Sequence, residues 1–244
     1  MKPIVPAAVI TCSLGLAAFA VRYRSEVRRL WRQVPSHREY WEARNADGEF
    51  SYLSLGDSSA QGIGVDDPGE GYVSVLADRL AEREGRAVAV RNLSVSGATV
   101  GSLLAKQIPQ LEGLPQPDVC TLFIGGNDMI KRSFDANRFR DRFDQVLSAM
   151  PPGTFVGELP TFGHWPFEPR VRTANQIIAD LVPKHGHHLV PLYATSRAQW
   201  PFRMFHHVNG DWFHPNQLGY QLWADTYWRT MIDVLGASEA RVAG

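Results

Sequence analysis

Four short polar blocks in this 244-residue chain carry the side chains from which nucleophilic catalysis is built. The blocks are Gly56-Asp57-Ser58-Ser59, residues 92–97, residues 125–128 and residues 211–215. A serine hydroxyl is a poor nucleophile until a neighbouring base takes its proton, and a histidine imidazole suits that task. A carboxylate can fix the tautomer of the imidazole. Together the blocks contain the parts of an acyl-transfer site.

The elements that must position these blocks alternate between strand and helix patterns. Mostly apolar runs predict five strands, at 50–55, 88–93, 119–124, 154–159 and 188–192. Apolar residues at helical spacing predict helices at 71–83, 100–111, 134–150, 171–184 and 217–235. Strands that alternate with helices form a parallel sheet covered on both faces. We therefore expect an α/β fold, a three-layer α/β/α sandwich with a five-stranded parallel sheet, over residues 48–237, with a short tail at 238–244.

In open parallel sheets, ligands bind beyond the carboxyl ends of the strands. Three of the polar blocks follow predicted strands, and the fourth precedes the last predicted helix. The stretch 193–211 has no regular pattern, and loops of that length are usually functional. We expect all four blocks to meet at one edge of the sheet.

The blocks, in this order, resemble those of the SGNH hydrolases, also called GDSL esterases and lipases. The matching residues are Gly56-Asp57-Ser58, Gly97 in Asn-Leu-Ser-Val-Ser-Gly-Ala-Thr, Gly125-Gly126-Asn127-Asp128 and Asp211-x-x-His214-Pro215. The resemblance spans residues 56–215 and implies a flavodoxin-like sheet. One residue departs from the family pattern, because Ser59 stands where leucine is usual. The chain has no Gly-x-Ser-x-Gly elbow, which argues against the larger α/β-hydrolase fold.

The resemblance implies a role for each matched residue. Ser58 is the implied nucleophile, His214 its general base and Asp211 the carboxylate that orients the base. The implied oxyanion hole consists of the backbone N–H groups of Ser58 and Gly97 and the side-chain amide of Asn127. In comparable sites, one such donor contributes about 3–4 kcal/mol to stabilising the transition state.

Purely structural interpretations of the same residues stay open at this point. Ser58 and Asp211 could cap helices, Asn127 could belong to a turn, and His214 could lie on the surface. Two further residues, Asp57 and Asp128, are expected to be structural, in turns or caps.

Aromatic residues near the last block, and one after the fourth predicted strand, are expected to line the substrate pocket. They are Trp165, Trp200, Phe205, Trp212 and Phe213. Such side chains form an acyl pocket or a lip that touches a membrane. An equally weighted alternative is that they close the core beneath the loop. His164 and Phe167 are further candidates for the same cleft.

Charge and metal-ligand patterns exclude several other functions. The 25 basic and 25 acidic residues balance, so the chain lacks the basic excess of a nucleic-acid-binding protein. Its two cysteines, Cys12 and Cys120, support neither a disulfide framework nor a cysteine-based zinc site. Histidines cluster at 185–188 and 206–207, but no His-Glu-x-x-His pattern accompanies them. We predict no metal site, and the resemblance implies no cofactor.

The N-terminal region predicts a hydrophobic helix. Residues 4–21 contain no charged side chain and reach the lower limit of a membrane-spanning length. We interpret 1–21 as a membrane anchor or, alternatively, a cleaved signal peptide with Ala18-Phe19-Ala20 at its cleavage site. Five arginines follow it, Arg22, Arg24, Arg28, Arg29 and Arg32, and favour a cytoplasmic catalytic domain. Cleavage would instead give a secreted protein. Residues 22–47 are expected to form an amphipathic juxtamembrane linker or a solvated spacer.

The sequence thus predicts a serine ester hydrolase that cleaves small-molecule or lipid acyl esters through an acyl-enzyme intermediate. A carbohydrate O-deacetylase or a thioesterase of the same fold is the alternative. From other classes, a non-catalytic membrane-associated binding protein stays open. A metal-dependent phosphoesterase built on the histidine clusters stays open too, and a chelator would test it.

Overall fold

The computed structural model describes residues 5–44, 47–202 and 206–242 of the chain. Within them, a parallel sheet is formed by β1 (Phe50–Gly56), β2 (Val88–Asn92), β3 (Val119–Phe123), β4 (Phe155–Gly157) and β5 (His188–Val190). The strand order is β2-β1-β3-β4-β5, as in flavodoxin-like sheets. This confirms the predicted α/β class and its five-stranded parallel sheet.

The strands are apolar because both faces of the sheet are covered. All of β3 and all but one residue of β1 are buried. The polar side chains inside the sheet bond to one another: Tyr52 Oη lies 2.9 Å from Thr121 Oγ1, which lies 3.2 Å from Ser54 Oγ. Their mutual hydrogen bonds remove the cost of burying unpaired hydroxyls.

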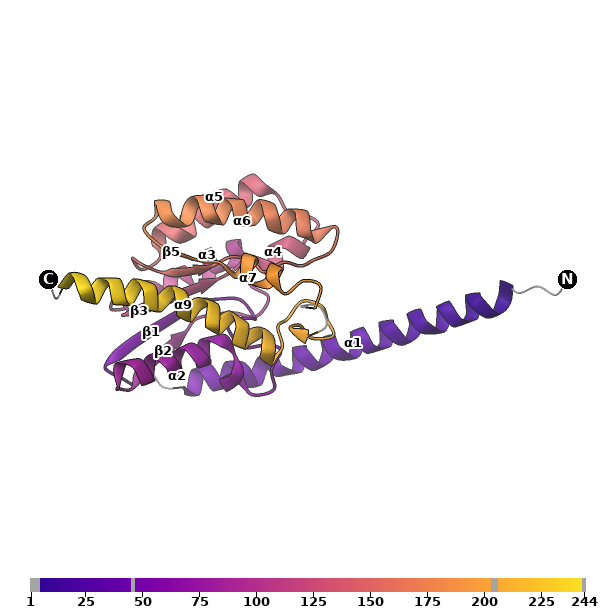
Figure 1. Cartoon of the computed structure of the whole chain (residues 1–244), viewed down its shortest axis with the longest axis horizontal. Helices are drawn as coiled ribbons and strands as arrows, with labels where there is room; N and C mark the ends of the chain where they lie inside the picture. The colour runs from indigo at the N-terminus through magenta and orange to yellow at the C-terminus, as the bar shows by residue number, and fades with distance from the viewer. Residues whose placement is uncertain (1–4, 45–46, 203–205, 243–244) are drawn as a thin grey trace.

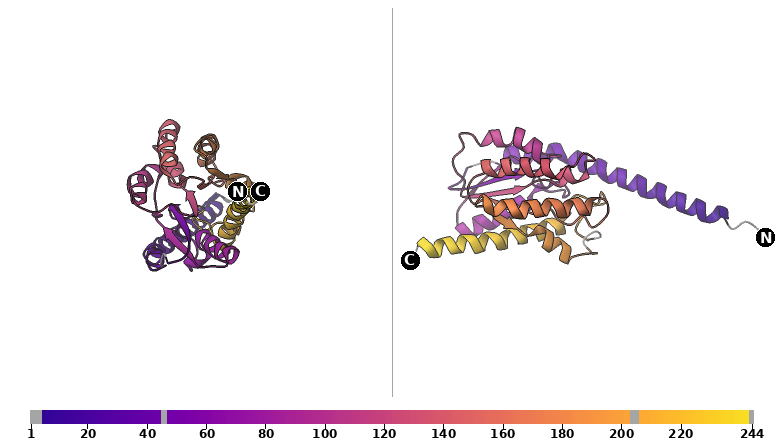
Figure 2. Two further views of the ribbon diagram at one scale, coloured as in Figure 1. Left: turned by 90° about the vertical axis from the view of Figure 1, so that its left-hand side faces the viewer. Right: turned by 90° about the horizontal axis from the view of Figure 1, so that it is seen from above.

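Helices form a layer on each side of the sheet (Figure 1, Figure 2). On one side α2 (Tyr72–Glu84) packs against α9 (Gln217–Val242); on the other α5 (Ala136–Ala149) packs against α3 (Val100–Lys106) and α6 (Phe167–Lys184). Local sequence fixes several helix ends. Thr99 and Ser102 form a capping box at the start of α3, and Gly85 ends α2 in the left-handed conformation with φ 64°.

The observed elements differ from the predicted ones at several boundaries. Two further helices occur, α4 (Gly126–Ile130) and α7 (Leu192–Ala198). The expectation of irregular chain is therefore wrong for residues 193–198. β5 ends at Val190, because Pro191 has no N–H to continue the ladder. The last helix continues to Val242, through most of the predicted tail at 238–244.

One helix, α1 (Val5–Ala43), runs across the predicted boundary between residues 1–21 and 22–47. Figure 1 shows its first half extending away from the domain and its second half packed against it. Buried side chains follow at intervals of three or four residues on the packed face: Leu30, Gln33, His37 and Trp41. Among the described residues, no helix combines the length and apolarity that crossing a membrane requires. The transmembrane and signal-peptide predictions gain no support from these helices.

Candidate active site

The strand order places three of the four polar blocks around the crevice of the sheet. β1 leads directly to Ser58, its neighbour β3 leads to Asn127, and β2 leads to Gly97. The order reverses between β1 and β3, where ligands bind in sheets of this kind. The loop before α9 brings the fourth block to the same place.

Ser58, His214 and Asp211 lie in one hydrogen-bonded chain. Ser58 Oγ is 2.9 Å from His214 Nε2, and His214 Nδ1 is 2.5 Å from Asp211 Oδ2. Ser58 and Asp211 are buried, and His214 is half-buried. The neighbouring hydroxyl of Ser59 belongs to a buried residue outside this chain of bonds. The arrangement lets the imidazole accept the proton of the Ser58 hydroxyl while the carboxylate holds its other nitrogen protonated.

A tight turn fixes the positions of His214 and Asp211. Asp211 Oδ1 accepts the backbone N–H groups of Phe213 and His214, both at 3.1 Å. Asn209 Nδ2 donates to the carbonyls of Gly64 and Pro215, at 3.0 and 2.9 Å. These bonds join the turn to the loop that follows Ser58.

Gln107 holds the backbone just before Ser58. Its side-chain amide bonds both polar groups of Gly56: Nε2 donates to the carbonyl at 2.7 Å, and Oε1 accepts the N–H at 3.0 Å. Gly56 itself must lack a side chain, because a Cβ would stand 2.4 Å from the Phe123 carbonyl oxygen. No sequence motif marks Gln107, which directly follows α3.

Asp57 is buried inside the same turn. Its Oδ1 accepts the N–H of Ser59 at 2.9 Å, which is the structural role predicted from the sequence. Burial raises the pKa of Asp57 to about 6, although the Ser59 N–H and the nearby His214 act in the opposite direction. Asp128 is also structural, since its Oδ2 accepts the N–H of Val100 at 3.0 Å at the start of α3.

Three hydrogen-bond donors converge beside Ser58. Asn127 Nδ2 donates to the Ala98 carbonyl at 3.0 Å, which orients the amide. Gly97 lies in a turn closed by the N–H of Ala98 and the Val95 carbonyl, and its φ of 77° favours glycine. Within the described chain, the N–H groups of Ser58 and Gly97 have no hydrogen-bond acceptor. They are therefore available, with Asn127, to bind an oxyanion.

A cavity of about 620 Å³ opens at these residues. Its wall includes Ser58, Gly97, Asn127, Asp211 and His214 together with apolar side chains. Of the predicted pocket residues, Trp212 and Phe213 line the cavity, as do His164 and Phe167.

The structure places the other predicted aromatics elsewhere. Trp165 is 83% exposed and does not belong to the cavity wall. Trp200 lies against the backbone of Gly163, with Arg197 over its ring, and is likewise outside the wall. Phe205 lies outside the described residues. The α1 side chains that complete the wall were missed: Phe19, Tyr23, Val27, Leu30, Trp31 and Val34.

Glu168 fixes the loop that carries Phe162 into the cavity. Its Oε2 accepts the N–H groups of Phe162 and Gly163, both at 2.8 Å, and the Thr161 hydroxyl at 2.9 Å. Burial acts to raise the pKa of Glu168, but these donors outweigh it and hold the pKa below its ordinary value. The sequence analysis did not identify this buried carboxylate.

Two of the clustered histidines, His185 and His187, have hydrogen-bond partners within the protein. His185 Nε2 lies 2.8 Å from Asp144 Oδ1, and His187 Nε2 lies 2.9 Å from the Leu147 carbonyl. Throughout the described ranges, no group of three or more histidine, cysteine or acidic side chains could hold a metal ion.

Comparison with known proteins places this site in a family. Residues 54–222 match the GDSL-like lipase/acylhydrolase family, so the chain belongs to that family of ester-bond hydrolases. A stretch of 123 residues is 26% identical to "Putative endoglucanase X" of Acetivibrio thermocellus, covering 50% of this chain and 53% of the relative. A stretch of 81 residues is 35% identical to the uncharacterized protein YpmR of Bacillus subtilis, covering 32% of this chain and 31% of the relative. The chain thus spans about half or less of these curated relatives.

Solved structures share the fold at low sequence identity. LAE5, an alpha/beta hydrolase from the metagenome of Lake Arreo, has a TM-score of 0.63 and 22% identity over 75% of this chain and 94% of its own. TesA has a TM-score of 0.62 and 22% identity over 74% of this chain and 97% of its own. Axe2, an acetylxylan esterase from Geobacillus stearothermophilus, has a TM-score of 0.60 and 16% identity over 76% and 95%.

Proposed function

We propose that this protein cleaves acyl esters with Ser58 as nucleophile, His214 as general base and Asp211 as the orienting carboxylate. The observation that carries the proposal is the continuous bonding from Ser58 Oγ to His214 Nε2 and from His214 Nδ1 to Asp211 Oδ2, at 2.9 and 2.5 Å. A nucleophile bonded to a base that is itself oriented by a third group is the arrangement on which covalent acyl transfer depends.

The reaction proceeds in two halves. Ser58 Oγ attacks the carbonyl carbon of the ester while its proton passes to His214 Nε2. The oxyanion that forms accepts hydrogen bonds from the N–H groups of Ser58 and Gly97 and from Asn127 Nδ2. His214 then gives the proton to the leaving alcohol, which leaves an acyl group on Ser58. In the second half His214 takes a proton from water as the water attacks the acyl-enzyme. His214 then returns the proton to Ser58 Oγ as the bond to the acyl group breaks and the acid leaves.

The cavity favours a substrate with an apolar acyl group over a sugar ester. Apart from the polar residues at the reaction centre, its wall is mainly aliphatic and aromatic, including Ile63, Ile130 and Phe162. An acetyl group would leave most of about 620 Å³ unfilled. We therefore favour an esterase or lipase activity over carbohydrate deacetylation; a thioester with the same acyl group would fit equally well.

We also propose that the protein is attached to a membrane through residues 1–21, with the catalytic domain in the cytoplasm. The support is in the sequence: 4–21 contains no charge, and five arginines follow within eleven residues. Membrane sedimentation and protease protection of intact cells test attachment and side. Cleavage after Ala20 with release outside the cell would support the signal-peptide alternative.

Hydrolysis of p-nitrophenyl butyrate by the full-length protein tests the proposed activity. Ser58→Ala is expected to lower turnover by about 10⁴-fold or more, as in other serine triads. Ser59→Ala, the adjacent hydroxyl, is the matched control and is expected to retain most activity. Equal activity of wild type and Ser58→Ala would contradict the mechanism, and loss of activity in EDTA would favour the phosphoesterase alternative.

A further inference from the structure

The cavity beside Ser58 has a wall that lies outside the family match. Six residues of α1 line it, whereas the family match begins at residue 54. They form a stripe along one side of the helix, at 19, 23, 27, 30, 31 and 34. Intervals of three and four residues keep these side chains on one face. The wall is thus a continuous apolar surface built by a single helix.

Polar contacts hold this helix against the two loops of the site. Arg29 bonds Asp66 Oδ1 at 2.7 Å and Asn209 Oδ1 at 3.1 Å. Gln33 Oε1 accepts the N–H of Gly64 at 3.1 Å. Asn209 in turn donates to Gly64, so α1, the loop after Ser58 and the loop before His214 form one network. The position of the wall is therefore specified by side chains and does not rest on apolar contact alone.

The apolar stripe continues beyond the cavity mouth. Leu30 is buried and Val27 and Val34 are half-buried, whereas Trp31 is 66% and Phe19 54% exposed. Towards its N-terminus the same helix leaves the domain and continues to Val5, within the uncharged run 4–21. An apolar track thus leads from Ser58 to the segment proposed to enter a membrane.

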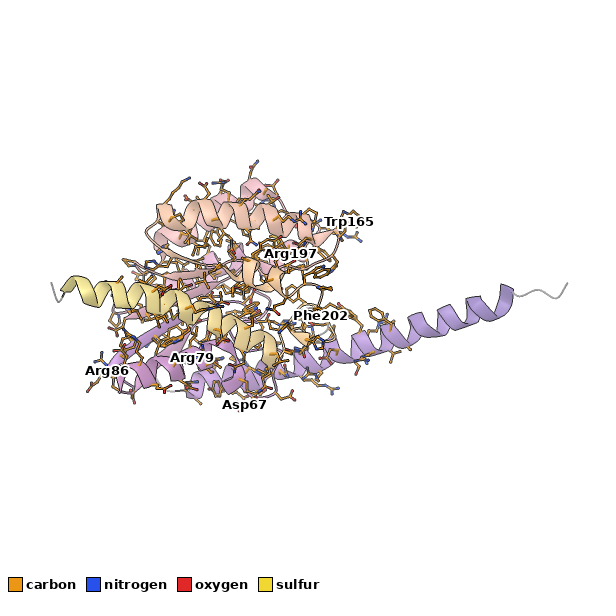
Figure 3. All side chains as sticks on the ribbon, in the orientation of Figure 1. Asp67, Arg79, Arg86, Trp165, Arg197 and Phe202 are labelled. Carbon is orange, nitrogen blue, oxygen red and sulfur yellow. The ribbon has the colours of Figure 1, made fainter. Side chains whose placement is uncertain are left out.

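Two exposed aromatic residues lie at the same end of the domain. Figure 3 shows Trp165 and Phe202 at the end from which α1 emerges, and they are 83% and 65% exposed. Aromatic side chains gather where a protein meets the headgroup level of a bilayer. This end of the domain, from which α1 emerges, therefore exposes aromatic side chains of the kind that meet a bilayer surface.

We propose that α1 guides the long acyl chain of a bilayer lipid ester to Ser58, so that this helix determines acyl-chain specificity. This inference rests on the proposed function and names its substrate class. Moving an acyl chain through water costs about 0.8 kcal/mol for each methylene group. A continuous apolar wall from bilayer to nucleophile avoids that cost, because the chain stays in contact with apolar surface along its path.

A matched pair of substitutions in α1 tests the proposal. Val27 lines the cavity, whereas Val21 is exposed on the same helix and does not. In the full-length protein, Val27→Trp fills the proposed acyl path and Val21→Trp is the control. The substrates are 4-methylumbelliferyl oleate in dioleoylphosphatidylcholine vesicles, the same ester in detergent micelles, and soluble 4-methylumbelliferyl butyrate.

We expect Val27→Trp to lower the ratio of oleate to butyrate kcat/KM about tenfold, as overpacking of a filled site would. Val21→Trp should leave the ratio unchanged, and wild type should cleave oleate faster from vesicles than from micelles. An unchanged ratio in Val27→Trp would overturn the assignment of the wall. Equal rates from vesicles and micelles would overturn the bilayer as the source.

A binding measurement separates this inference from the proposed function. The fluorescent fatty acid cis-parinaric acid is titrated into Ser58→Ala protein with and without each tryptophan substitution. If binding is weaker with Val27→Trp but not with Val21→Trp, the result supports α1 as the wall of an acyl-binding site, even if no ester is cleaved. Failure of wild type to cleave butyrate, with this binding difference intact, would reject the proposed activity and retain the acyl site.

Discussion

Two buried aspartates stand within one site and have different surroundings. Asp211 accepts hydrogen bonds from His214 Nδ1 and from two backbone N–H groups, whereas Asp57 accepts the N–H of Ser59. The partners of Asp211 all orient the base. Asp57 instead closes the turn that presents Ser58, and burial raises its pKa to about 6. The site thus separates an orienting carboxylate from one that shapes the backbone.

The raised pKa of Asp57 predicts a pH-dependent stability. The folded state binds this proton more tightly than the unfolded chain, so the stabilisation is complete below about pH 4 and is lost as pH rises through about 6. Asp57→Asn keeps an acceptor for the Ser59 N–H without the buried charge. Its free energy of unfolding should exceed that of wild type by about 3 kcal/mol at pH 7 and converge with it near pH 4.

Urea unfolding of both proteins between pH 4 and pH 7 measures this difference. Asp67→Asn is the matched control, because Asp67 Oδ1 accepts the N–H of Gly69 at 2.8 Å in the same kind of turn but is exposed to water. The difference in free energy of unfolding between Asp67→Asn and wild type should not change comparably between pH 4 and pH 7. A constant difference between Asp57→Asn and wild type across the pH range would contradict the account.

Of the three proposed oxyanion donors, the Asn127 side chain is the one that a substitution can remove. Asn127→Ala should lower kcat for p-nitrophenyl butyrate by about 10²–10³-fold with a smaller change in KM, since the bond strengthens as negative charge develops. A thermal melt checks that loss of the bond to the Ala98 carbonyl has not unfolded the protein. An unchanged kcat in a folded variant would remove Asn127 from the oxyanion hole.

The backbone of Trp212, in the same turn, adopts a conformation that costs conformational energy. It has φ 60°, the left-handed conformation, which costs a residue with a side chain about 1–2 kcal/mol. The turn tolerates it because Asp211 and Asn209 bond both sides of it, and the Trp212 N–H reaches the Asn209 carbonyl at 3.0 Å. This conformation lets Asp211 and His214 face each other across a three-residue spacing.

At the scale of elements, the site depends on segments that contribute no reacting atom. The short helix α3 leads to Gln107, which fixes β1 at Gly56, and the first turn of α6 supplies Glu168 to the Phe162 loop. α1 braces both catalytic loops through Arg29 and Gln33. Gln107, Glu168 and Gln33 bond backbone groups, whereas Arg29 bonds the side chain of Asn209.

Gln107→Leu tests the contact between α3 and β1. It removes the acceptor of the buried Gly56 N–H, whereas the Gly56 carbonyl keeps the Val95 N–H as a donor at 3.2 Å. The lost bonds should lower the free energy of unfolding by about 2 kcal/mol. The matched control is Gln110→Leu, because Gln110 is exposed and bonds only within its own turn, to the Lys106 carbonyl. Equal stability of the two variants would show that the contact does not support the fold.

Glu168→Gln tests the contact between α6 and the Phe162 loop. The folded-state pKa of Glu168 is below its ordinary value, so its stabilisation is present above the unfolded pKa and is lost as the pH falls through the folded pKa. The melting temperature of the variant should lie below that of wild type at pH 7, and the gap should narrow in acid. Glu112→Gln, on the exposed surface, is the control. A gap that persists unchanged in acid would rule out the ionised carboxylate as its source.

For the whole molecule, the sheet and the site blocks follow from patterns that are local in sequence. The apolar run of β3 and the Gly-Asp-Ser turn after β1 can each be recognised from a few consecutive residues. The strand order then brings them together. The wall built by α1 could not be predicted in this way. Only tertiary packing brings its stripe to the cavity that Ser58 lines, and the arginines between its apolar positions are typical of a linker.

The predictions for two aromatic residues were wrong for the same reason, because their positions depend on tertiary packing. Trp165 follows β4 and Trp200 lies shortly before Asp211, but Trp165 is exposed to solvent and the Trp200 ring packs on Gly163. The position of a ring after a strand or near His214 in the sequence therefore did not determine whether it lines the cavity. The same limit applies to Gln107 and Glu168, whose roles depend on backbone groups brought close by folding.

The most direct test of the central claim is covalent labelling with a fluorophosphonate, followed by mass spectrometry of the modified peptide. Ser58 bonded to His214 should react and carry the adduct, and His214→Ala should abolish labelling in a protein that still folds. An adduct on Ser59, or none on a folded wild-type protein, would contradict the assignment of Ser58 as the activated nucleophile.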